Sequence, residues 1–65
     1  MLTNCEIGDL IVNYDASNGV PEGANGIVTN VTRNRVTVDF FEHGAITVDP
    51  RKTMGMYIVA IKADN

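Results

Sequence analysis

The sequence predicts an all-β domain, a small, partly open barrel of five short strands. Residues 25–41 are rich in valine, isoleucine and threonine at the two-residue period of a strand, and a short polar break divides them at residues 32–35. No stretch keeps the 3.6-residue period of a helix. The 65 residues suffice for a single domain. A hydrophobic content of 45% with 20% charged residues indicates a folded chain rather than disorder.

The two apolar runs of residues 25–41 are expected to form a β-hairpin. In the second run the inward side chains are Val36, Val38 and Phe40. Phe41 then points outward, because successive side chains of a strand alternate between faces. Asn34 suits the turn since it tolerates positive φ. Gly26 opens the first run, where the lack of a Cβ permits a bulge or a close backbone crossing.

Three further strands are expected around this hairpin. They cover residues 10–14, 45–49 and 56–62, with Leu10, Val12 and Tyr14 sharing one face and Ile46 and Val48 turned inward. The near-continuous apolar run of the last strand predicts contact on both of its faces. Residues 15–25 form a long loop, and residues 51–55 form a single helical turn. Residues 1–7 form a loose N-terminal arm of the same domain, or alternatively a short edge pairing. The long loop is the first place to expect a binding surface.

This arrangement of elements predicts an SH3-like barrel with a long first loop and a one-turn helix before the last strand. An OB-type barrel or another small meander is the alternative. The residues that carry a family resemblance are Gly8-Asp9, Asn18-Gly19, Gly26-Ile27-Val28, Val36-Thr37-Val38-Asp39-Phe40, Glu42-His43-Gly44 and Tyr57-Ile58-Val59-Ala60. With them the chain resembles the SH3-like segment inserted in RecD-like and relaxase-type superfamily 1 helicases. Less closely, it resembles a KOW-type module through Gly8-Asp9, the Gly23 and Gly26 pair, Val28, Val31 and Val36-Thr37-Val38. The resemblance implies a nucleic-acid-associated context.

Charge and cysteine content narrow the expected setting. A net charge of −3 and a pI near 4.7 disfavour non-specific binding to phosphate backbones, although five basic residues could cluster locally. The single cysteine, Cys5, excludes an internal disulfide and fits a reducing compartment. No apolar run approaches the length of a membrane-spanning helix, and the first residues lack the pattern of a signal peptide. We therefore expect a cytoplasmic protein without membrane contact.

No constellation of residues predicts catalysis or a cofactor. His43 is the only imidazole, and without a second ligand of its type it predicts neither a metal site nor a general base. Cys5 is followed by Glu6, whose charge disfavours a reactive thiolate. A phosphate-binding Gly-x-x-x-x-Gly-Lys loop is absent from the sequence. We expect no enzyme activity, no cofactor and no bound metal.

The candidate binding residues are basic pairs and outward aromatic side chains. They are Tyr14, Arg33, Arg35, Phe41, Arg51 and Lys52. Arginine and lysine suit phosphate contact or simple solubility, and aromatic faces on small barrels serve single-stranded nucleic acid or proline-rich peptides. We expect a non-catalytic binding or accessory module within a nucleic-acid-associated or other protein assembly, with a protein partner favoured and single-stranded nucleic acid possible.

The alternative function is structural. The chain could self-associate as a homo-oligomer through an edge strand or the apolar face of residues 56–61, since small barrels gain stability in that way. An enzyme whose site forms only between subunits is the third hypothesis.

Overall fold

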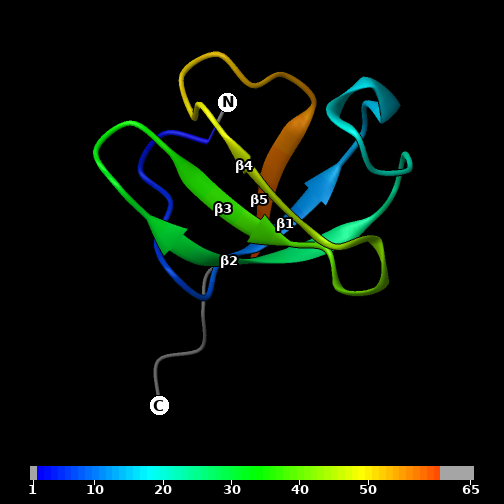
Figure 1. Cartoon of the computed structure of the whole chain (residues 1–65), viewed down its shortest axis with the longest axis horizontal. Helices are drawn as coiled ribbons and strands as arrows, with labels where there is room; N and C mark the ends of the chain where they lie inside the picture. Colours follow the sequence, from blue (N-terminus) through cyan, green and yellow to red (C-terminus); the bar gives the residue numbers. More distant parts are fainter. Residues whose placement is uncertain (1, 61–65) are drawn as a thin grey trace.

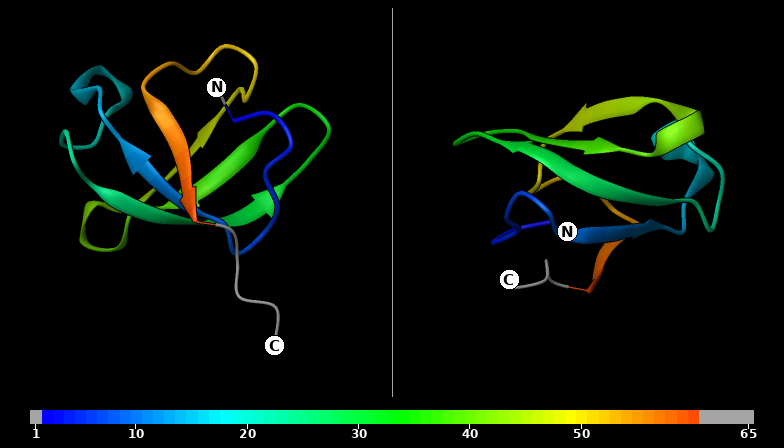
Figure 2. Two further views of the ribbon diagram at one scale, coloured as in Figure 1. Left: turned by 180° about the vertical axis from the view of Figure 1, so that it is seen from behind. Right: turned by 90° about the horizontal axis from the view of Figure 1, so that it is seen from below.

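The computed structural model describes residues 2–60 and contains a five-stranded antiparallel sheet (Figure 1). The strands are β1 (Leu10–Asn13), β2 (Asn25–Val31), β3 (Val36–Asp39), β4 (Ala45–Val48) and β5 (Met56–Ala60). Their order in the sheet is β4-β3-β2-β1-β5. The sheet curls, so that β3 and β4 lie over β1 and β5 (Figure 2). Within residues 2–60 no ladder joins β4 to β5, and the sheet is therefore open rather than a closed barrel.

The predicted hairpin is confirmed as β2 and β3. Val28 pairs with Val38 and Val31 with Val36, with a register shift between Val28 and Asn30. At the turn, the Thr32 amide donates to the Arg35 carbonyl oxygen at 2.8 Å. The inward residues Val36, Val38 and Phe40 are buried, as the alternation of side chains predicts.

Gly26 lies at a close crossing of β2 and β3. A Cβ at this position would stand 2.7 Å from Val38 Cγ1 and 2.8 Å from the Asp39 carbonyl oxygen. Only a residue without a side chain fits, because one of the two obstacles is backbone and cannot rotate away. The sequence prediction of a close backbone approach here is confirmed.

Leu2 and Cys5 pack into the core, which corrects the expected loose arm over residues 2–7; Met1 lies outside the described residues. Leu2 is 0% exposed and Cys5 is also buried, and both belong to the hydrophobic core. The Leu2 amide donates to the Pro50 carbonyl oxygen at 2.9 Å. A domain this small has few large apolar side chains, so burying one more leucine stabilises the fold by an estimated 1.5–3 kcal/mol.

The last strand differs from the prediction of contact on both faces. Met56 is fully buried, but Tyr57 is 51% and Val59 is 53% exposed. The outer face of β5 is therefore largely open to solvent in the described part of the chain. The predicted extension over residues 61–62 lies outside the described residues.

The helical turn predicted at residues 51–55 is also wrong. Instead, the Asp49 carbonyl oxygen accepts from the amides of Lys52 and Thr53, which makes one hydrogen-bonded turn without a helix. The two 3₁₀ turns of the described residues lie elsewhere, at η1 (Ala16–Asn18) and η2 (Phe41–His43). Gly55 follows at φ +79°, which excludes a continued right-handed turn.

Candidate functional site

The long loop of residues 14–24 is held by the side chain of Asn13. Asn13 is fully buried at the end of β1. Its Nδ2 donates to the carbonyl oxygens of Val20 at 2.9 Å and Pro21 at 3.2 Å, and its Oδ1 accepts from Asn18 Nδ2 at 2.9 Å. These partners lie on both limbs of the loop. The buried side-chain amide of Asn13 therefore holds a loop that forms no β-ladder hydrogen bonds of its own.

Further hydrogen bonds tie this loop to the connection between β4 and β5. Asn18 Nδ2 also donates to the Met54 carbonyl oxygen at 2.7 Å, and the Tyr14 amide donates to the Gly55 carbonyl oxygen at 2.7 Å. The loop expected to provide a binding surface thus satisfies much of its polar backbone internally.

The 3₁₀ turn η1 begins at Asp15. The Asp15 carboxylate accepts from Ser17 Oγ at 2.7 Å and from the Ser17 amide at 2.9 Å. These two hydrogen bonds, the side-chain one first, lower the pKa of Asp15 below its ordinary value. Asp15 therefore caps the turn and is accounted for structurally.

Phe41 stands exposed beside an open groove. It is 59% exposed, as predicted, and its φ of +58° is one that a bulky side chain rarely adopts. The groove is lined by Pro21, Glu22, Gly23, Ala24, Asn25, Phe40, Phe41, Glu42 and His43. His43 Nε2 lies 3.6 Å from Glu42 Oε1 within it. This end of the molecule carries carboxylates and no lysine or arginine along the groove.

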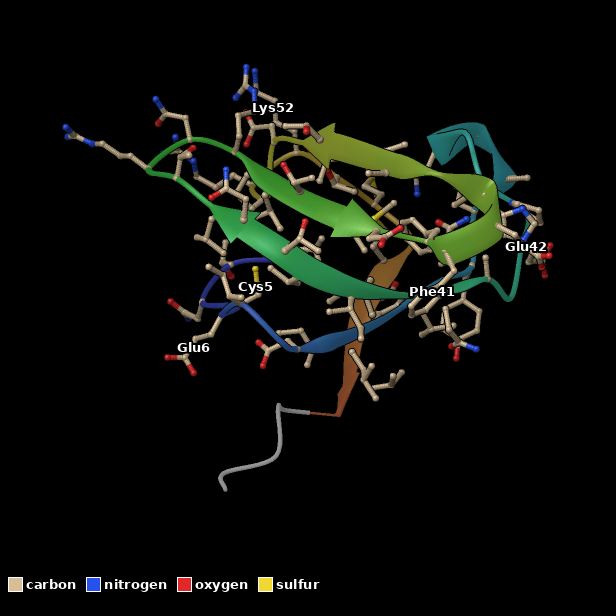
Figure 3. The ribbon with its side chains drawn as sticks, turned by 60° about the horizontal axis from the view of Figure 1, so that its bottom comes forward. Cys5, Glu6, Phe41, Glu42 and Lys52 are labelled. Atoms are coloured by element: carbon tan, nitrogen blue, oxygen red, sulfur yellow. The ribbon has the colours of Figure 1, made fainter. Side chains whose placement is uncertain are left out.

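The predicted aromatic residues do not lie with the basic ones. Tyr14 packs against Tyr57, with ring centroids 5.7 Å apart and an angle of 49° between the rings. This pair belongs to the β1–β5 part of the sheet. Phe41 and Glu42 lie in the opposite half of the molecule from Lys52 (Figure 3).

The four predicted basic residues, by contrast, come together at one end of the sheet. Arg33 and Arg35 lie in and directly after the β2–β3 turn, and Arg51 and Lys52 lie in the β4–β5 connection. Arg51 Nη2 donates to Asn34 Oδ1 at 3.4 Å, which joins the two loops. We call these four residues the basic end.

Among the described residues, the carboxylate that contacts the basic end is that of Asp49. Asp49 Oδ2 lies 3.6 Å from Arg35 Nη1, and Asp49 Oδ1 accepts from the Arg51 amide at 3.0 Å. Among residues 2–60, Arg33 and Lys52 take part in no ion pair and no side-chain hydrogen bond. The positive charges of Arg33 and Lys52 are thus not neutralised by an ion pair among the described residues.

Charge is therefore segregated along the molecule. The basic end carries four positive charges, and Asp49 adds one negative charge beside them, which gives 4 − 1 = +3. The whole chain has a net charge of −3, so the remainder carries −3 − 3 = −6. Glu6 lies in the same half of the molecule as Lys52. In the view of Figure 3 the two are on opposite sides of the β2–β3 hairpin, with Glu6 below β2 and Lys52 above β3. The net charge of the sequence conceals this local excess of cations.

A small hollow adjoins the basic end. It is lined by Leu2, Thr3, Asn4, Cys5, Val31, Thr32, Arg33, Val36, Pro50 and Arg51 and has a volume of about 230 Å³. Burial, followed by the nearby charge of Asp9, raises the pKa of the Cys5 thiol above its ordinary 9.0. Cys5 is therefore a neutral, packed thiol at pH 7, as the sequence predicts for an inert cysteine.

Other chemistry is sparse in the described residues. Within residues 2–60, no three histidine, cysteine, aspartate or glutamate side chains gather in a way that could hold a metal ion. None of the helical segments described is long and apolar enough to cross a membrane.

Sequence reasoning missed the two residues that organise the ends of the domain. The sequence pattern assigned Asn13 to a strand without a special role and Leu2 to the N-terminal arm. The signal that could have found Asn13 was an amide side chain at the end of a predicted strand, directly before a long loop. The N-terminal segment has no periodicity that could have placed Leu2.

Scans against models of known protein families, curated proteins and solved structures found no match for this chain. What is inferred about its function therefore comes from its own residues.

Proposed function

We propose that this chain is a non-catalytic SH3-like binding module that contacts nucleic acid through its basic end as an accessory part of a larger assembly. The SH3-like assignment is supported by the curl of the sheet and by the pairing of β1 with β5 beside a β1–β4 meander. Strand order alone specifies no ligand, so the partner is argued from charge.

The observation that carries the proposal is the +3 excess at the basic end of a chain whose net charge is −3. Clustered cations on two loops joined by the Arg51–Asn34 hydrogen bond present a preformed positive surface. Phosphate backbones bind such surfaces by releasing condensed counterions, and the negative remainder of the molecule limits non-specific adhesion. The expected contact is weak, dependent on salt and confined to one end.

A salt series tests this proposal. Fluorescence anisotropy with a labelled single-stranded oligonucleotide is measured from about 20 to 200 mM salt, where each phosphate neutralised adds about 0.7 to the slope of log affinity against log salt. Up to four cations give a slope of about −1.5 to −3. An affinity that does not respond to salt, or no binding at the lowest salt, would contradict the proposal.

Paired charge reversals locate the contact. Arg33→Glu changes the net charge by two at the basic end, and Glu42→Lys changes it by two, with opposite sign, at the groove end. We expect at least a tenfold loss of affinity for Arg33→Glu and less than a twofold change for Glu42→Lys, because the field of an exposed charge falls off within about 10 Å at 0.1 M salt. Equal and opposite effects would show that only net charge matters.

A second candidate function is self-association through β5, supported by its exposed apolar residues. Tyr57 and Val59 face outward on a strand whose second edge is unpaired within residues 2–60. A register shift against β1 lies beside Val59, and such irregularities hinder regular pairing of strand edges. Light scattering at millimolar concentration tests this candidate, and a strict monomer would exclude it.

A further inference from the structure

The open groove beside Phe41 has two walls of similar composition. One wall is the end of the loop before β2, where Pro21 and Glu22 are exposed. The other wall includes the 3₁₀ turn η2, where Phe41 and Glu42 are exposed (Figure 3). Each wall therefore offers one accessible apolar side chain and one carboxylate to whatever enters the groove, which has a volume of about 700 Å³.

Phe41 is presented to solvent by a strained and well-fastened turn. Its φ of +58° is unfavourable for a bulky residue and persists only where the surrounding structure imposes it. Here the Phe41 amide donates to Asp39 Oδ1 at 2.9 Å, and the Phe41 carbonyl oxygen accepts from the Gly44 amide at 3.0 Å. The ring gains little packing in return, since it is mostly exposed. An exposed aromatic side chain on a preformed turn suits a binding anchor, because little further ordering of the backbone is needed when a partner covers it.

The carboxylates of the groove are not neutralised by a lysine or arginine. Among residues 2–60, Glu22 takes part in no ion pair and no side-chain hydrogen bond, and the ion-pair partner of Glu42 is His43, with Nε2 3.6 Å from Oε1. Neither lysine nor arginine lines the groove in the described part of the chain. The groove therefore attracts cations and repels phosphates.

We propose that this groove binds a segment of a partner protein in which arginine or lysine side chains flank a large apolar side chain. The apolar side chain packs between Pro21 and Phe41, and the cations beside it face Glu22 and Glu42. An arginine also has the exposed ring of Phe41 to stack on. The inference extends the accessory role of the proposed function by giving the chemistry of a protein partner. It does not depend on the phosphate contact, because Phe41 and Glu42 lie in the opposite half of the molecule from Lys52 (Figure 3).

Other occupants fit the groove less well. Nucleic acid would bring its phosphates against two carboxylates. A metal ion would need more ligands, because within residues 2–60 no three histidine, cysteine, aspartate or glutamate side chains gather in a way that could hold one. A purely apolar segment would leave Glu22 and Glu42 without a counter-charge. The basic end of a second copy would match the charge, and it is an outcome of the test below.

The direct test compares three short labelled peptides by fluorescence anisotropy at low salt. Arginine and leucine alternate in the first, serine replaces leucine in the second, and glutamate replaces arginine in the third. We expect the first to bind about tenfold more tightly than the second, as for an apolar side chain buried at the centre of an interface, and the third not to bind. Equal affinities for the first two would show attraction to negative charge alone and would overturn the groove as a specific site. Binding of the third peptide, or of none, would overturn it as well.

Substitutions in the two walls locate the contact. Phe41→Asn removes the ring at a backbone conformation that asparagine tolerates, so the fold is kept while the affinity for the arginine–leucine peptide should fall about tenfold. Glu22→Gln should lower this affinity about two- to fivefold, as for the loss of an exposed ion pair. Tyr57→Asn, a matched loss of an exposed aromatic side chain on β5, should leave it unchanged. Equal losses for Phe41→Asn and Tyr57→Asn would contradict the proposed site.

Amide shifts distinguish this inference from the proposed function. The arginine–leucine peptide should shift residues 21–25 and 40–44, and saturating oligothymidylate should change its affinity by less than about twofold, since the two ends are screened from each other. Loss of oligonucleotide binding with the peptide response intact would overturn the proposed function alone, and the reverse would overturn the groove alone. Shifts at both ends when the chain alone is concentrated would place a second copy in the groove and overturn the separate protein partner.

Discussion

The two ends of the sheet are built in different ways. At one end, the loop of residues 14–24 is fastened by a buried amide, that of Asn13, and by hydrogen bonds to the β4–β5 connection. At the basic end, two loops meet through one exposed hydrogen bond of 3.4 Å and one ion pair of 3.6 Å. A fastened loop uses its polar groups internally, whereas a lightly joined pair of loops leaves its cations available. Loop length alone thus favours one end of the sheet, whereas the proposed function uses the other.

The largest effect is expected from removing the amide that fastens the long loop. Asn13→Ala leaves the carbonyl oxygens of Val20 and Pro21 without their donor in a buried site, which should lower the free energy of unfolding by about 2–4 kcal/mol. Urea denaturation followed by circular dichroism measures this. Asn30→Ala, at an exposed position of β2, is the control and should cost less than about 0.5 kcal/mol. Similar losses for both variants would show that Asn13 does not organise the loop.

A smaller effect separates the arginines within the basic end. Arg35 is paired with Asp49, whereas Arg33 has no ion pair among the described residues. Arg33→Ala should therefore weaken oligonucleotide binding about three- to tenfold, as expected for a cation facing phosphate. Arg35→Ala should weaken it about half as much on a logarithmic scale, because the guanidinium of Arg35 is already engaged by Asp49 and has fewer donors left for a phosphate. A larger loss for Arg35→Ala would contradict the charge distribution described above.

At the groove end, we expect a gain of stability from relaxing the backbone of Phe41. Its φ of +58° strains a bulky residue, and its side chain is mostly exposed, so Phe41→Asn should stabilise the fold by about 0.5–1 kcal/mol. Thermal unfolding measures this change. Destabilisation would show that the ring contributes packing that outweighs the strain.

The smallest effect concerns the cap of η1. Ser17→Ala removes the hydrogen bond from Ser17 Oγ to the Asp15 carboxylate and should lower the stability only slightly at pH 7. Because the folded-state pKa of Asp15 is lowered, its contribution is present above the ordinary value of 3.8 and is lost as pH falls through the folded-state pKa. The difference in stability between the wild type and the variant should therefore shrink below pH 4. A constant difference between pH 7 and pH 2 would argue against this linkage.

Much of the fold follows from local pattern, and the exceptions have specific causes. The β2–β3 hairpin was predictable because Val36, Val38 and Phe40 alternate with polar residues, and their period fixes which face is buried. Burial of Leu2 depends on a contact with Pro50, 48 positions along the chain, which no local period encodes. The exposed face of β5 was missed because an apolar run reads as buried whether or not another segment covers it.

The candidate site was predictable as residues but not as a surface. Each basic pair is visible in the sequence, yet the approach of the Arg33 turn to Arg51 depends on the antiparallel pairing of β3 with β4. The hollow beside them depends on the N-terminal segment, which has no pattern of its own. Tyr14 and Phe41 are aromatic, as binding residues often are, but they lie away from the basic end. The sequence does not show how far apart these residues lie in the fold.

The most direct test of the charge segregation is an amide-shift titration with a single-stranded oligonucleotide at two salt concentrations. The proposed function predicts the largest shifts at residues 31–36 and 50–53 and a loss of most of this response at the higher salt. Shifts centred on Phe41 and the loop of residues 14–24, or shifts that do not weaken with salt, would contradict it.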